Sequence, residues 1–94
     1  MKDGDRYKNG QIKQEVSDGV RTVYFTDGTV KARGGVADGK MHGEWHFYRK
    51  SGELWVHGSL KEDVQDGRWI RYNRDGSVEK EMWFVDGKQT GGGS

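Results

Sequence analysis

The sequence predicts an all-β fold, a single-layer antiparallel β-meander of about six to eight strands built from repeated hairpins. The first observation behind this prediction is an internal repeat with a period of 24 residues, which places Trp45 in register with Trp69. The second is a series of glycine-marked turns between runs of β-branched and aromatic residues. The third is the absence of proline and of any apolar pattern with a helical period.

The repeat divides one continuous domain, residues 1–90, into four units. The expected bounds are a truncated capping repeat over 1–18, and full repeats over 19–42, 43–66 and 67–90. Gly10 and Gly19 are close together, so the first return strand is expected to be short, as in a terminal repeat. Residues 91–94, Gly-Gly-Gly-Ser, are interpreted as a linker or expression scar and excluded from the fold.

Within each full unit, an opening strand, a tight turn and a return strand are expected. Glycines are expected at the hairpin tips because φ > 0 is accessible to them at little cost. The tip glycines are Gly10, Gly28, Gly52 and Gly76. The second connection is expected at Asp18-Gly19, Asp38-Gly39, Asp66-Gly67 and Asp86-Gly87. Gly34-Gly35 interrupts a return strand and indicates a bulge or a close backbone approach.

Alternation along the strands assigns side chains to the two faces of the sheet. One parity of the return strands is apolar, and a structural column of tyrosines is expected beside it on the packed face. The column is Tyr24, Tyr48 and Tyr72. Simple parity places Trp45 and Trp69 on the opposite face, and a bulge near Gly43 or Gly67 would reverse this assignment.

Aromatic side chains are numerous for so polar a chain, and two interpretations stay open. They form cross-strand stacks that hold the sheet together, or they form a strip that binds a partner. The candidate partner-binding residues are Arg21, Trp45, Phe47, Trp69, Trp55 and Trp83.

The stretch DGKMHGEWHFYRKSGEL, residues 38–54, resembles the MORN repeat in its variant, bacterial type. The match is good again over 66–78, partial over 18–30, where Arg21 replaces the tryptophan, and residual over 7–12. The resemblance implies an elongated single-layer meander that acts as a scaffold, a dimerisation module or a protein-binding surface. Antitoxin-like roles and phospholipid binding are also associated with the family.

Composition and charge exclude several classes of function. The net charge is +1 with both signs interspersed, which favours neither nucleic acid nor lipid headgroups as a partner. No apolar run is long enough for insertion into a membrane. The chain has no cysteine, which fits a cytoplasmic location, although a secreted fragment would have the same composition.

Residues with catalytic or metal-binding chemistry are few. His42, His46 and Glu44 share strand parity, and a divalent metal could bind if His57 approaches across the hairpin. The other units carry threonine or isoleucine in place of His46, so the position tolerates apolar packing. The Asp-Gly pairs follow the hairpin period and lack the spacing of a calcium loop. The sequence therefore predicts no metal, no cofactor and no enzyme.

The function predicted is non-catalytic interaction with a protein partner, or self-association, through an aromatic sheet face. One alternative is a ligand-binding sheet that stacks sugars or nucleobases on exposed tryptophan and tyrosine. Another is an antitoxin or immunity-type protein that binds a partner.

Overall fold

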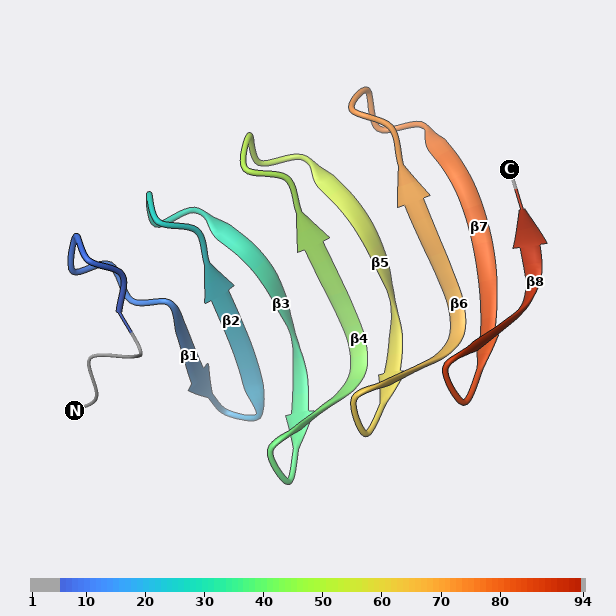
Figure 1. Ribbon diagram of the computed structural model, residues 1–94, viewed down its shortest axis with the longest axis horizontal. Helices are drawn as coiled ribbons and strands as arrows, with labels where there is room; N and C mark the ends of the chain where they lie inside the picture. Colours follow the sequence, from blue (N-terminus) through green and yellow to red (C-terminus); the bar gives the residue numbers. More distant parts are fainter. Residues whose placement is uncertain (1–5, 94) are drawn as a thin grey trace.

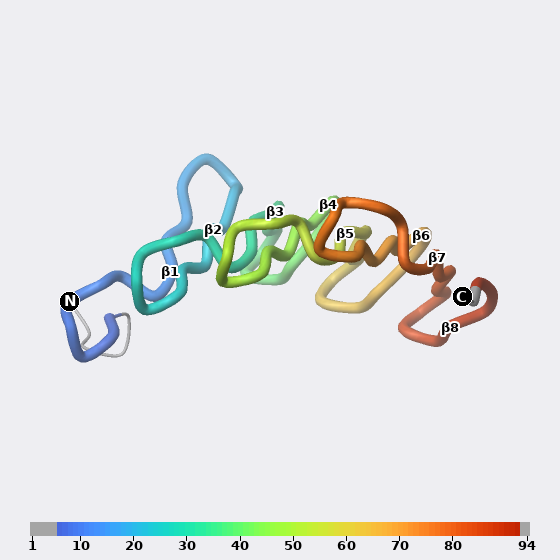
Figure 2. Tube along the Cα trace, turned by 90° about the horizontal axis from the view of Figure 1, so that it is seen from above, coloured from blue at the N-terminus to red at the C-terminus, as the bar shows by residue number. Residues whose placement is uncertain are grey.

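The computed structural model describes residues 6–93, whose strands form one eight-stranded antiparallel sheet in which each strand pairs with the next along the chain (Figure 1). The strands are β1 (Gln14–Ser17), β2 (Val20–Tyr24), β3 (Val30–Ala37), β4 (Lys40–Tyr48), β5 (Leu54–Lys61), β6 (Val64–Tyr72), β7 (Val78–Val85) and β8 (Lys88–Gly93). The exclusion of the C-terminal glycines from the fold is wrong for Gly91–Gly93, because they pair with β7 as part of β8. Over the described residues the fold is the all-β hairpin meander that the repeat predicts, and no helix is long and apolar enough to span a membrane. Seen from above, the hairpins follow one another in a row (Figure 2).

The hairpin tips are closed by glycines in the left-handed region, as predicted. The φ angles are +90° at Gly10, +90° at Gly28, +104° at Gly52 and +91° at Gly76. Each tip repeats the same pair of backbone hydrogen bonds. In the first full unit the Phe25 N–H donates to the Thr29 carbonyl at 2.8 Å, and the Gly28 N–H donates to the Phe25 carbonyl at 3.0 Å.

The opposite ends of the strands are joined by two-residue turns with positive φ, and one of these turns differs from the prediction. Asp18-Gly19, Asp38-Gly39 and Asp86-Gly87 form turns as expected. Asp66-Gly67 does not, because it lies inside β6, and the turn is formed by Glu62-Asp63. Gly67 has a φ of +94° at a strand irregularity, so this glycine adopts the left-handed conformation within a strand and not in a turn.

Single-residue bulges near the hairpin tips exchange the faces of the sheet. Val23 pairs with Ala32 but Tyr24 pairs with Val30, which leaves Lys31 as an extra residue in β3. Trp55 and Glu79 are the extra residues at the equivalent points of β5 and β7. Beyond each bulge the return strand therefore presents its apolar side chains to the other face.

The core lies on the face that carries Trp45 and Trp69, contrary to the prediction from simple parity. The buried cluster is Ala32, Trp45, Leu60 and Trp69, and the partly buried side chains packed against it are Val23, Val36, Met41, Phe47, Val56, Met82 and Phe84. We call this the tryptophan face. The opposite face, which carries Tyr24, Tyr48, Tyr72, Glu44, His46 and His57, is called the tyrosine face. The bulges are the reason for the difference, because parity counted through them assigns the wrong side.

Candidate functional site

Trp45 and Trp69 are structural residues whose indoles are buried, with exposed fractions of 1% and 5%. The Trp45 indole N–H donates to the Gly35 carbonyl at 2.8 Å, and the Trp69 indole N–H donates to the Ser59 carbonyl at 2.9 Å. These two side chains offer almost no surface to a partner. The expectation of an exposed strip is therefore wrong for both of them.

Phe47 and Arg21 lie in the same rows as these tryptophans. The Phe47 ring is half-buried and stacks between Trp45, at 5.9 Å, and Trp69, at 6.0 Å. Arg21 takes the place of a tryptophan in the first full unit and pairs with Gly34, and its guanidinium donates to the Gly39 carbonyl at 3.5 Å. The stacked rings of Trp45 and Phe47 from β4 and Trp69 from β6 thus form the centre of the tryptophan face.

Trp55 and Trp83 are exposed, with fractions of 41% and 44%, and they lie on opposite faces. Trp83 pairs with Arg68 on the tyrosine face and lies 5.9 Å from its guanidinium. Trp55 lies on the tryptophan face near the hairpin tips, where it borders a cavity of about 310 Å³. We call this cavity the aromatic cleft, and its lining residues are Phe25, Lys31, Phe47, Tyr48, Arg49 and Trp55.

The aromatic cleft combines an apolar floor with two cations. The Arg49 guanidinium lies 5.9 Å from the Trp55 ring, and the Lys31 ammonium lies 5.8 Å from the Phe25 ring. Arg49 is also held by a hydrogen bond of 3.1 Å to the Tyr72 carbonyl. Phe25, Lys31 and Arg49 were missed by the sequence reasoning. The repeat contains a signal that could have found them. Phe25 is in register with Arg49, and Lys31 is in register with Trp55, which the sequence analysis did select.

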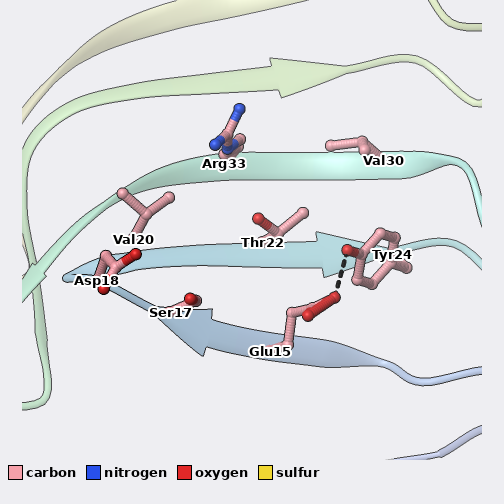
Figure 3. A pocket seen from close by; sticks show the side chains of 8 residues that line it. All are labelled: Glu15, Ser17, Asp18, Val20, Thr22, Tyr24, Val30 and Arg33. Carbon is pink, nitrogen blue, oxygen red and sulfur yellow. Dashed lines mark hydrogen bonds between the residues drawn. The ribbon is translucent and has the colours of Figure 1, made fainter.

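A second hollow of about 430 Å³ lies on the tyrosine face over β1, β2 and β3 (Figure 3). Its lining residues are Glu15, Ser17, Asp18, Val20, Thr22, Tyr24, Val30 and Arg33. The Tyr24 hydroxyl donates to the Glu15 carboxylate at 2.6 Å, and this hydrogen bond is the main cause that raises the pKa of Tyr24 above its ordinary value. The hollow has mixed polar and apolar walls and holds no pair of acid and base groups with contrasting surroundings.

The three tyrosines predicted to stack in one column on the packed face occupy equivalent positions on β2, β4 and β6, on the face opposite the core, so the prediction of a stacked column is wrong. Tyr24 pairs with Val30, and the later tyrosines pair with Leu54 and Val78 in the same way. A strand therefore lies between successive tyrosines. The Tyr72 ring stacks on His57 of the neighbouring strand, with centroids 5.6 Å apart.

Glu44, His46 and His57 lie together on the tyrosine face. His57 approaches the other two across the hairpin, which is the condition given above for binding a divalent metal. His46 and His57 are directly paired across β4 and β5, and their rings stack with centroids 5.1 Å apart. One ligand atom from each of the three side chains lies within 4.8 Å of the others. His42 is exposed and stands outside this group.

Comparison with known proteins supports the fold and leaves the family open. No family model matches the chain, and no curated protein matches it. One similar solved structure is a chain of the "GtfA/B complex bound to UDP and GlcNAc", with a TM-score of 0.55 and 17% sequence identity. The likeness covers 81% of this chain and 18% of that chain, so this chain spans less than a fifth of that protein. At this identity the likeness is one of fold.

Proposed function

We propose that the chain is a non-catalytic interaction module that holds a protein partner on its aromatic cleft. The observation that carries this proposal is the exposure of Trp55, at 41%, beside Phe25 and Phe47 in a cavity of about 310 Å³. Tryptophan and arginine are the residues most enriched among those that dominate binding energy at protein interfaces. In this cleft Trp55 and Arg49 stand side by side.

The side chains that line the cleft indicate which side chains of a partner would bind there. Its floor is aromatic, so an apolar or aromatic side chain of the partner would fill it and remove Trp55 from water. Lys31 and Arg49 stand at its border, so an acidic residue next to that anchor would find a cation. A partner segment with one apolar anchor and a neighbouring carboxylate fits both requirements.

The architecture supports the same role. A single layer over residues 6–93 leaves long surfaces open on both sides, and repeated units present extended surfaces for binding. The resemblance to variant MORN repeats also favours a scaffold or a protein-binding surface, and we propose membership of that family on the repeat described above. Self-association and an antitoxin-like role are forms of protein binding that the same cleft would serve.

The test uses two exposed tryptophans as a matched pair. Trp55→Ser removes the cleft's exposed anchor, whereas Trp83→Ser removes an equally exposed indole from the other face. We expect Trp55→Ser to weaken partner binding, or self-association followed by light scattering, at least tenfold, since loss of a central anchor costs about 2 kcal/mol or more. Trp83→Ser is expected to bind as the wild type does.

Two results would contradict the proposal. Equal binding by the two variants would show that the cleft is not the docking site. A saturable change of Trp55 fluorescence with a sugar or a nucleotide, in a wild-type protein that stays monomeric, would assign the cleft to a small ligand instead.

A further inference from the structure

We propose that Glu44, His46 and His57 form a surface site for one first-row divalent cation, with zinc as the representative ion. Two imidazoles and one carboxylate are a ligand set that zinc accepts, with a fourth position left for water or another ligand. The same set is poorly suited to magnesium or calcium, which prefer oxygen ligands. This site lies on the tyrosine face and is separate from the aromatic cleft.

The distances allow the three side chains to close on one ion. Their ligand atoms lie within 4.8 Å of one another. Around a tetrahedral zinc ion with bonds of about 2.0–2.2 Å, neighbouring ligand atoms are about 3.3 Å apart. The ligand atoms therefore need to approach by about 1.5 Å at most. Because the His46 and His57 rings are stacked with only 16° between their planes, one ring must also turn out of the stack so that both lone pairs point to one ion. Rotation of the half-buried His46 side chain and of the exposed Glu44 would supply both changes. No change in backbone pairing is required.

Neighbouring groups already orient two of the ligands. The His57 Nε2 lies 2.8 Å from the Tyr72 hydroxyl, and its Nδ1 faces Glu44 Oε1 at 3.0 Å. Without an ion, the 3.0 Å contact is a hydrogen bond in which Nδ1–H donates to the Glu44 carboxylate. With an ion bound, the tautomer that donates Nε2–H to the Tyr72 hydroxyl would turn the Nδ1 lone pair toward the cation, which would take the place of that proton. The Ser59 hydroxyl donates to Glu44 Oε2 at 3.2 Å and holds the carboxylate on that side. Such partners orient metal ligands in proteins generally.

The repeat shows that the fold does not require these three residues. In register with Glu44, His46 and His57, the first full unit has Val20, Thr22 and Arg33, and the third has Arg68, Ile70 and Glu81. The third unit places the Arg68–Glu81 ion pair where the second has Glu44 and His57, and it places Ile70 where the second has His46. A ligand set confined to one unit is thus a feature added to the fold.

The experiment titrates the full chain with zinc chloride by isothermal titration calorimetry. The wild type is expected to bind one zinc ion with saturation in the micromolar range. His46→Thr installs the residue of the first unit at this position, so the sheet should be retained, and the affinity should fall at least tenfold. His42→Ala removes a histidine outside the cluster and should bind as the wild type does. Magnesium chloride should give no saturable heat.

A second measurement needs no variant. Ni²⁺ added to labelled wild-type protein should broaden the NMR signals of His46, His57 and Tyr72 before those of His42. Absence of saturable zinc binding by the wild type would overturn the proposal. So would equal affinity in His46→Thr, or broadening centred on His42.

Discussion

At the scale of single residues, Gly34 and Gly58 decide how the two core tryptophans pack. A Cβ atom built on Gly34 would lie 2.2 Å from the Trp45 ring, and one on Gly58 would lie 2.2 Å from the Trp69 ring. Each indole therefore rests directly on backbone, and its N–H reaches the carbonyl of the residue after that glycine. The glycine is needed here for space, whereas at the tips it is needed for φ.

Gly58→Ala is expected to be strongly destabilising. The added methyl group would force the Trp69 ring away and break its hydrogen bond to the Ser59 carbonyl, which together should lower the free energy of unfolding by about 2–4 kcal/mol. Urea denaturation followed by circular dichroism measures this. Ser59→Ala is the control, because Ser59 faces the other side and keeps its carbonyl. Equal stability of the two variants would show that Trp69 does not pack on Gly58.

At the scale of the hairpin, short polar bonds organise the tips of the first and third full units. The Asp27 carboxylate accepts from the Thr29 hydroxyl at 2.7 Å and from its N–H at 3.0 Å. Asp75 accepts from Ser77 in the same way, at 2.6 Å and 2.9 Å. The side-chain hydrogen bond is the largest cause that lowers the pKa of each aspartate, and the backbone hydrogen bond adds to it.

The lowered pKa values predict how stability depends on pH at these tips. The unfolded aspartates titrate near 3.8, and the folded ones below that, so the unfolded chain binds more protons as the pH falls through this range. The contribution of the two carboxylates is complete above pH 3.8 and is lost as the pH falls toward their folded pKa values. The melting temperature of the double variant Asp27→Asn and Asp75→Asn should therefore fall less between pH 5 and pH 2.5 than that of the wild type.

The control for net charge is the double variant Asp18→Asn and Asp38→Asn, which changes the charge equally at the opposite turns. A melting temperature that falls equally steeply in the tip variant and the wild type would mean that these carboxylates do not support the tips.

At the scale of the whole molecule, a single sheet has no second layer to pack against, so its core consists of side chains on one of its faces. The described chain measures 43 × 33 × 19 Å, and its core cluster lies over β3 to β6, in the middle of the meander. Toward the ends the side chains are more exposed, as at Val16 and Val85, which are 56% and 54% exposed. Stability is therefore expected to decrease from the central hairpins toward both termini.

The four tryptophans report on this division between core and surface. In the double variant Trp55→Phe and Trp83→Phe, emission comes from Trp45 and Trp69, which are buried, so acrylamide should quench it several-fold less than in the wild type. Unfolding in urea should remove the difference. Quenching in the folded double variant as strong as in the wild type would mean that the indoles of Trp45 and Trp69 are accessible, and that the tryptophan face is not the core.

Local requirements of the backbone explain how much of the fold the sequence predicts. The left-handed conformation at Gly28, Gly52 and Gly76 depends only on the four consecutive residues of each hairpin tip. The spacing of these tips along the chain sets the register of the repeat. The strands and the antiparallel order follow from the same turns. The same local rule misplaced one connection, because a left-handed glycine serves a strand irregularity at Gly67 as readily as it serves a turn.

The sequence by itself determined the repeat, the strands, the tip glycines and the all-β meander, because each depends on neighbours along the chain. Tertiary structure decided which face is packed, because one extra residue in each return strand, such as Trp55, moves every later side chain to the other side. It also decided which side chains meet across strands: Trp45 on Gly34, Arg49 on the Tyr72 carbonyl, and His57 between Glu44 and Tyr72. Those contacts depend on the register between strands, and that register is set by turns and bulges acting together.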